Sequence, residues 1–450
     1  MERDGFKSRL GFILVSAGCA IGIGNVWKFP YVAGKSGGGI FVLFYFLFLA
    51  LIGVPILVME LSIGRAGRQG VIQAYKKLEP KKSKWHIHGW ICLFGCLLLM
   101  MYYTTVSGWM LDYCWKFLSG GFVGVTNKTA ESVFNNMLKN PAEMLIFMSI
   151  IVVLGFVVCS GGIKNGLEKV SKFMMLALLG LIVVLVINSL MLKGAGKGLE
   201  FFLSPDIERA SQAGWANVIT SAMTQAFFTL SIGIASMEIF GSYMSKDNTL
   251  PSESIRITAL DTFVAVMSGL IIFPACFSFD VEPSQGPALI FMTLPKIFIN
   301  MPFGRVWGTL FFLFMSFASF STVTAVFESL ISASIENFGL SRKKAAVINC
   351  VVMLAASLPC LLGFNVLSFV QLAGKNILDM EDFIVSNILL PVGALVFVAF
   401  CTSKYGWGFD KFLGESNTGK GFKFSPVLKN YFKFALPVMI ILVLVSGFVG

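Results

Sequence analysis

Hydroxyl side chains gather in one apolar stretch and are the first candidates for chemistry. Residues 316–330 read SFASFSTVTAVFESL, which places Ser319, Ser321, Thr322 and Thr324 at one depth of an expected helix. Such hydroxyls often donate to a carbonyl of the preceding helical turn. They are also oxygen ligands for a hard cation. Both interpretations stay open from these residues alone.

Two other apolar stretches contain glycine and serine where a spanning helix needs helix formers. Residues 16–30 read SAGCAIGIGNVWKFP, and residues 227–243 read FFTLSIGIASMEIFGSY. Glycine inside a helix costs about 1 kcal/mol relative to alanine, and serine competes for backbone hydrogen bonds. Small residues also permit close helix packing in membranes. The alternative is a pair of unwound breaks, which is typical of a transporter's central site.

Acidic residues at membrane depth are a third signal. Asp261 is the only charged residue between Ile257 and Phe279, and Glu238 lies within the second glycine-rich stretch. An acid in hydrocarbon is costly and usually marks function. For Asp261 the alternative is a helix-end acid near water. For Glu238 there are also two interpretations. One is a contact with water or with a backbone break, and the other is a proton-linked role.

The elements that must position these residues are membrane helices. Apolar residues make up 56% of the 450 and charged residues only 13%, whereas soluble chains carry about 25% charged residues. A spanning helix needs about 20 mostly apolar residues. Eleven such segments lie near 10–34, 38–64, 87–117, 142–159, 166–192, 213–243, 252–279, 305–336, 345–363, 380–402 and 431–449. Helices are expected because hydrocarbon offers no partner for unpaired backbone groups.

The placement of basic residues predicts the orientation. With the N-terminus inside, 24 of the 35 Lys and Arg residues fall in inside segments or at the inner start of the last helix. Cytoplasmic loops carry an excess of Lys and Arg. We therefore expect a cytoplasmic N-terminus and, with an odd number of helices, a C-terminus outside.

Other function classes find little support. The net charge of +11 could suggest nucleic acid, but basic residues gather in the loops of membrane proteins, so we expect no nucleic-acid partner. None of the cysteines in apolar segments has metal-ligand spacing with His86 or His88, and we expect buried thiols. With no nucleophile–base pair or metal cluster at membrane depth, we expect neither an enzyme nor an organic cofactor.

Five motifs carry a resemblance to a known family. They are GCAIGIGNVWKFPYVAGKSGGGIF, GVPILVMELSIGRAGR, YYTTVSGW, QAFFTLSIG and LDMEDF. In this order and spacing the chain resembles the neurotransmitter:sodium symporter family, bacterial amino-acid transporter branch, over nearly its whole length. The implied fold is an all-α polytopic membrane protein of 11 transmembrane helices. Two inverted five-helix repeats, 10–192 and 213–402, have helices 1 and 6 unwound, and helix 11 (431–449) completes one transporter domain, 1–450.

The resemblance also implies two sodium sites made of oxygen atoms, since unwound backbone supplies carbonyl ligands to a hard cation. The first site matches the Ala20 carbonyl and the side chains of Asn25, Thr229 and Asp261, completed by the substrate carboxylate. The second matches the carbonyls of Gly18, Ile21 and Ala318 and the hydroxyls of Ser321 and Thr322.

A substrate pocket is implied between these sites. The substrate carboxylate would meet the backbone near Gly22 and Gly24, at a half-helix N-terminus, and the hydroxyl of Tyr103. Its ammonium group would meet the carbonyls of Ala20, Phe228, Thr229 and Ser231. Its side chain would face Leu99, Phe228, Ile234, Thr322 and Val326. This mostly apolar lining favours an apolar or aromatic L-amino acid.

Two gates follow from the same resemblance. Outside, Lys28 and Asp382 match a charged pair in which the family usually has Arg, and Lys cannot make the same bidentate fork. Phe228 and Tyr103 would form the lid over the substrate. Inside, Arg3 and Glu336 match the cytoplasmic latch, with Tyr243 nearby and Phe6 packing where Trp is usual.

Three positions depart from the family pattern. Leu176 replaces a frequent proline of helix 5, and Glu238 stands where an apolar residue is expected. Asp261 and Ala265 fall where chloride-dependent relatives carry a neutral Asn and a Ser. A carboxylate there supplies the negative charge that chloride otherwise brings, so we expect chloride-independent transport. Glu60 does match the family and is expected to tie the broken helices together by hydrogen bonds.

The function expected from these residues is sodium-coupled symport of a small L-amino acid by alternating access. Helices 1, 2, 6 and 7 would move against a scaffold of helices 3, 4, 8 and 9, in the lipid bilayer of a bacterial inner membrane. One alternative is a proton-coupled amino-acid permease of the same fold. Such relatives commonly have a fixed cation in helix 5, whereas residues 173–192 contain no Lys or Arg. Another is a non-transporting receptor or channel on this fold.

Overall fold

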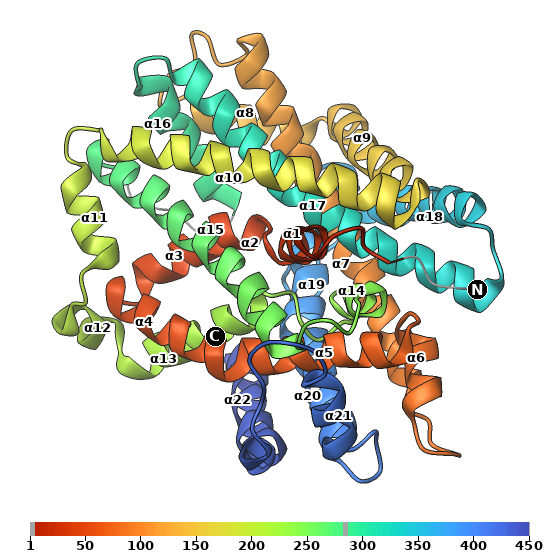
Figure 1. Ribbon diagram of the computed structural model, residues 1–450. Helices are drawn as coiled ribbons and strands as arrows, with labels where there is room; N and C mark the ends of the chain where they lie inside the picture. Colours follow the sequence, from red (N-terminus) through yellow and green to blue (C-terminus); the bar gives the residue numbers. More distant parts are fainter. Residues whose placement is uncertain (1–4, 282–286, 450) are drawn as a thin grey trace.

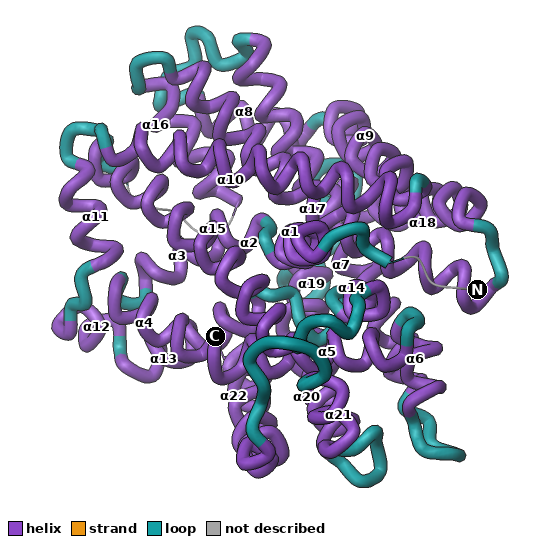
Figure 2. Tube along the Cα trace, in the orientation of Figure 1, coloured by secondary structure: helices purple, strands orange, loops and turns teal. Residues whose placement is uncertain are grey.

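The computed structural model describes residues 5–281 and 287–449, and these residues are almost entirely helical (Figure 2). Over that range the backbone forms α-helices, short π-helical and 3₁₀ turns and three isolated bridges, and no strand. A helix pairs the backbone groups of its interior within one segment, which is what the interior of a bilayer requires.

Nine helices among the described residues are long and apolar enough to cross a membrane. They are α4 (Gly39–Phe48) continued by α5 (Val54–Gly67); α7 (His86–Ser119); α9 (Pro141–Ser160); α10 (Glu168–Leu190) with the π-turn Ile163–Leu167; α15 (Leu250–Ser278); α17 (Gly304–Phe338); α18 (Arg342–Leu362); α19 (Ile377–Phe383) continued by α20 (Leu390–Thr402); and α22 (Leu436–Val449) with the turns before it. The chain is therefore a multi-pass membrane protein.

The first expected span is broken near its middle. Helix α1 (Arg9–Ala20) ends where Ile21 and Gly22 take extended backbone conformations, and the chain resumes as α2 (Ile23–Val26) and α3 (Lys28–Lys35). The two parts differ in direction by 66°. Gly22 is needed here because a Cβ atom would lie 2.5 Å from the Tyr103 hydroxyl oxygen. The glycines noted in the sequence thus mark a true break.

The sixth expected span is also interrupted. Helix α13 (Trp215–Phe228) and helix α14 (Glu238–Tyr243) are separated by nine residues without helical structure. Ser231, Gly233 and Ala235 have positive φ angles, and a Cβ atom on Gly233 would collide with the Leu390 carbonyl. The carboxylate of Glu60, on α5, accepts hydrogen bonds from the backbone N–H groups of Gly233 and Met237. Glu60 thereby replaces part of the missing helical bonding.

The segments predicted from hydropathy correspond to these helices within a few residues. Several short helices between the spans were not anticipated, because none reaches the length that the hydropathy criterion requires. They are α6 (Val71–Leu78), α8 (Ala130–Lys139), α11 (Ala195–Leu203), α12 (Ile207–Ala213), α16 (Leu294–Asn300) and α21 (Phe409–Ser416).

Helix α17 forms the centre of the bundle. In its most apolar stretch 78% of the residues are buried, against 22% for the stretch that contains α22. Helix α17 contacts α1, α7, α9 and α10, while α1 lies directly beside α10 at the centre of the view in Figure 1. The hydroxyl-bearing face of α17 is therefore held against the broken first span, where it can contribute to a site.

Candidate functional site

A cavity of about 590 Å³ lies between the two broken spans and helices α7, α17 and α19. Nine residues proposed for the substrate line it, and these are Ala20, Gly22, Gly24, Leu99, Tyr103, Phe228, Thr229, Ser231 and Thr322. Ile234 and Val326, the other two proposed residues, are buried but do not line this cavity. Instead, the Ile234 carbonyl accepts a hydrogen bond from the Cys96 thiol, with 3.3 Å between sulfur and oxygen.

The side chains proposed for the first sodium site form one buried cluster. Asn25 Nδ2 lies 2.8 Å from Asp261 Oδ1, and the Thr229 hydroxyl donates to Asp261 Oδ2 over 2.8 Å. Asn25 Oδ1 accepts from the backbone N–H of Gly22 over 3.0 Å. Asp261 has no exposed surface. Three segments thus bring polar side chains to one point beside the cavity, and they are α2, the end of α13 and the middle of α15.

The oxygens proposed for the second sodium site also converge. The Ser321 hydroxyl lies 2.9 Å from the Gly18 carbonyl oxygen and 2.8 Å from that of Ala318. The Thr322 hydroxyl lies 3.3 Å from the Gly18 oxygen and 3.2 Å from the Ile21 oxygen. Five oxygens from α1, its break and α17 therefore lie close together, and none carries a formal charge.

The backbone at the first break is held by Tyr103. Its hydroxyl oxygen accepts a hydrogen bond from the N–H of Ile23 over 3.1 Å. Ile23 is the first residue of α2, so this N–H has no partner within the helix. Tyr103 also lines the cavity. The phenol therefore marks the place where an anionic group could meet both a hydroxyl and a helix end.

The proposed outer gate residues both line the cavity but do not form an ion pair. Within the described residues Lys28 and Asp382 form no salt bridge, and the ammonium nitrogen of Lys28 lies 3.9 Å from the centre of the Phe228 ring. Asp382 instead accepts hydrogen bonds from the hydroxyls of Tyr102, over 2.9 Å, and Ser386, over 2.8 Å. The cavity thus continues from the broken helices past both charged residues.

The proposed inner gate is packed. The ring of Phe6 lies edge-on to Tyr243, with 6.2 Å between ring centres, and also contacts Phe12 and Phe240. Glu336 accepts hydrogen bonds from the Gly70 N–H over 2.8 and 3.1 Å. Arg3, the expected partner of Glu336, lies outside the described residues.

Several residues around the site were not singled out from the sequence. Tyr102, Gln225 and Asp379 line the cavity. Glu328, fully buried, accepts from the Tyr243 hydroxyl over 2.8 Å and pairs with Arg342. The signal for Tyr102 was present, because it directly precedes Tyr103 in YYTTVSGW. Glu328 could be noticed as an acid within an apolar segment, but its partner lies on the next helix.

Comparisons with known proteins agree over the full length of the chain. A sequence model of the sodium:neurotransmitter symporter family matches residues 3–123 and 128–450. The chain is 36% identical over 445 residues to the sodium-dependent transporter YhdH of Bacillus subtilis, covering 98% of this chain and 97% of that protein. It is 30% identical over 459 residues to a sodium-dependent transporter of Haemophilus influenzae, covering 99% and 98%.

A solved structure shares the fold. The crystal structure of MhsT in complex with L-phenylalanine superposes with a TM-score of 0.88 at 34% sequence identity, covering 99% of this chain and all of that one. Members of this family are sodium-dependent transporters and not enzymes. The motifs, the paired breaks and these matches together place the chain in the sodium:neurotransmitter symporter family, in its bacterial branch.

Proposed function

We propose that this protein imports an apolar or aromatic L-amino acid together with sodium, by alternating access and without chloride. The observation that carries the proposal is the meeting of both broken spans and the α17 hydroxyls around one cavity. Membership of a sodium-dependent transporter family supports sodium coupling. The bound L-phenylalanine named for MhsT supports an amino acid as substrate.

The proposal includes the architecture that such a mechanism needs. If the bent pair α1–α3 and the pair α13–α14 each cross once, they and the nine long helices of the described residues would make eleven crossings. Residues 10–192 and 213–402 would form the two inverted repeats, with residues 431–449 as the added helix. The excess of basic residues in the even-numbered connections supports a cytoplasmic N-terminus and, with eleven crossings, a C-terminus outside. A bacterial inner membrane is the proposed location.

Two sodium ions fit the donor sets. The second site offers five neutral oxygens, and the first offers Asn25, Thr229 and the carboxylate of Asp261. In the first site, Asp261 would balance the sodium charge, and the substrate carboxylate would complete the shell. Buried charge that is left uncompensated is strongly unfavourable. This balance is the physical reason for proposing that chloride is not required.

The lining of the cavity favours the proposed substrate class. Leu99 and Phe228 offer apolar surface, while Ser231 and Thr322 add two small hydroxyls. Gly22 leaves no side chain to neutralise the substrate ammonium, so the ligand must bring its own carboxylate. Family members for amines carry Asp at the position of Gly22. Amino acids are therefore expected to bind, and amines without a carboxyl group are not.

Transport by purified protein in liposomes tests this function. An inward sodium gradient should drive accumulation of labelled L-phenylalanine or L-leucine. The sodium concentration is varied at fixed pH, and the pH is varied at fixed sodium. A proton-coupled permease would respond to the change in pH and not to the change in sodium. A receptor or channel would bind ligand without counterflow of labelled substrate. Failure to accumulate any of the twenty amino acids with sodium would contradict the proposal.

A further inference from the structure

The start of helix α1 is bound to a buried carboxylate on helix α10. Glu168 is only 3% exposed, and its Oε2 accepts a hydrogen bond from the backbone N–H of Lys7 over 2.7 Å. Its Oε1 accepts from the Ser8 hydroxyl over 3.1 Å. Ser8 is itself the N-cap of α1 and accepts from the Gly11 N–H over 3.0 Å. Lys172, also on α10, donates from its ammonium group to the Ser8 hydroxyl over 3.3 Å. Two side chains of α10 therefore hold the first turn of α1, and Glu168 makes two of the three hydrogen bonds.

The space for this carboxylate is made by a glycine. A Cβ atom on Gly11 would overlap the carboxylate carbon and oxygen of Glu168. Gly11 has no positive φ angle, so an L-residue would be tolerated by the backbone there. The glycine is therefore explained by the approach of Glu168 rather than by backbone conformation.

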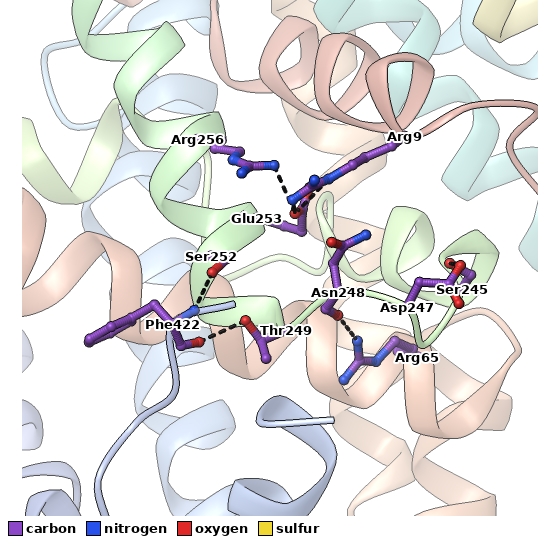
Figure 3. A network of polar contacts seen from close by, with 10 residues as sticks. All are labelled: Arg9, Arg65, Ser245, Asp247, Asn248, Thr249, Ser252, Glu253, Arg256 and Phe422. Carbon is purple, nitrogen blue, oxygen red and sulfur yellow. Dashed lines mark hydrogen bonds and ion pairs between the residues drawn. The ribbon is translucent and has the colours of Figure 1, made fainter. Parts of the chain in front are cut away.

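A second buried carboxylate, on another helix, holds the same turn. Figure 3 shows Arg9 reaching from α1 to Glu253 on α15, where Arg256 also approaches, with 3.4 Å between nitrogen and oxygen. Glu253 has no exposed surface. Helix α1 is thus tied to α15, the seventh helix, which belongs to the proposed moving bundle of helices 1, 2, 6 and 7, and to α10, the fifth helix, which does not.

We propose that Glu168 is an inner-gate residue, whose contact with Lys7 and Ser8 keeps α1 closed against α10 on the cytoplasmic side. This inference rests on the proposed alternating access. Opening the cytoplasmic side separates α1 from α10 and breaks these hydrogen bonds, whereas the Arg9–Glu253 pair travels with the bundle. An ionised acceptor near a helix N-terminus is favourable, so the contact stabilises the closed inner side.

Two substitutions weaken the contact from opposite sides. Glu168→Gln keeps the shape and removes the charge, and Gly11→Ala displaces the carboxylate. In an exposed helix, Gly→Ala would add helix stability. At Gly11 the added methyl group should instead push Glu168 away and favour opening of the inner side. An increase in the open fraction therefore indicates gating, whereas helix stabilisation alone would not increase it. Loss of a charge-assisted hydrogen bond is expected to raise the open fraction by about tenfold or more.

A cysteine on α10 reports the opening. Met175 is fully buried, and its sulfur lies 3.2 Å from where a Cβ atom of Gly18 would be. In Met175→Cys protein, the rate of modification by a polar thiol reagent added from the cytoplasmic side measures access. Nine native cysteines are free and eight of them are buried, so protein without the added cysteine gives the background. Both variants should raise the rate about tenfold in sodium-free buffer.

Glu253→Gln is the matched control, because it removes an equally buried carboxylate that binds the same helical turn. Its modification rate should stay within about twofold of the parent. Equal rates in parent and Glu168→Gln, or an equal rise in Glu253→Gln, would overturn the inference. Ser8→Ala provides a milder variant should Glu168→Gln fold poorly. Sodium-driven uptake by the parent is measured separately, so failure of the proposed function is seen there.

Discussion

Replacement of Thr322 by valine tests the second sodium site with almost no change in volume. The hydroxyl lies 3.3 Å from the Gly18 oxygen and 3.2 Å from the Ile21 oxygen. A cation bound there would gain this hydroxyl as a ligand, an interaction comparable to a hydrogen bond to a charged group, about 1.5–3 kcal/mol. Valine would remove it and leave the ion with one oxygen fewer.

The net effect is smaller than this, because valine also removes the hydrogen bonds that the hydroxyl donates to the two carbonyls. A neutral hydrogen bond contributes about 0.5–1.5 kcal/mol. The difference is about 1–1.5 kcal/mol, which corresponds to roughly a tenfold increase in the sodium concentration for half-maximal uptake. The melting temperature in saturating sodium should change far less than after loss of a buried apolar side chain.

The assay is uptake in liposomes over a range of sodium concentrations, with Thr324→Val as the matched control. Thr324 is equally buried and lies one half-turn along α17, but within the described part of the chain its hydroxyl bonds only to the Phe320 and Ser321 carbonyls of its own helix. Its sodium dependence should match the parent. An unshifted curve for Thr322→Val, or the same shift for Thr324→Val, would refute the reasoning.

Three further predictions concern charge and space. Replacing chloride with gluconate should leave uptake by the parent protein unchanged, whereas Asp261→Asn should reduce uptake severely. The double variant Asp261→Asn with Ala265→Ser should recover part of the uptake only when chloride is present. Loss of parent uptake in gluconate would count against Asp261 as the balancing charge. Tyrosine or leucine should raise the melting temperature in sodium while tyramine and isoamylamine do not, and equal shifts would reject the role given to Gly22. Gly233→Ala should abolish folded protein in size-exclusion chromatography or lower its melting temperature strongly, because the added methyl group meets the Leu390 carbonyl at a positive φ angle; a parent-like profile would contradict that packing.

Much of the fold could be read from local sequence. Long apolar runs predict the membrane spans, and clusters of glycine and serine predict the two breaks. The short helices were missed because α8 and α21 bury only one face and have no 20-residue apolar run. Their existence depends on the bundle surface that they cover.

The site was predictable only as far as the motifs reached. The convergence of polar groups around Asp261 and around Thr322 was predictable because their positions match family motifs. Spacing along the chain alone does not reveal such contacts, because the residues come from different helices. The placement of Ile234 away from the cavity depends on the path of the unwound segment, where Ser231 and Ala235 turn the backbone through positive φ angles. The contact of Lys28 with the Phe228 ring likewise depends on how two separate helices approach.

The contrast between the two proposed sodium sites would have an electrical consequence. The oxygens from Gly18, Ile21, Ala318, Ser321 and Thr322 are formally neutral, whereas the other site includes Asp261. With two sodium ions and a zwitterionic substrate, the loaded moving part carries one net positive charge inward. If Asp261 is ionised, the unloaded moving part carries one negative charge outward. In the membrane field this is equivalent to one positive charge moving inward. Membrane voltage, at about 2.3 kcal/mol per charge per 100 mV, would then drive both halves of the cycle equally.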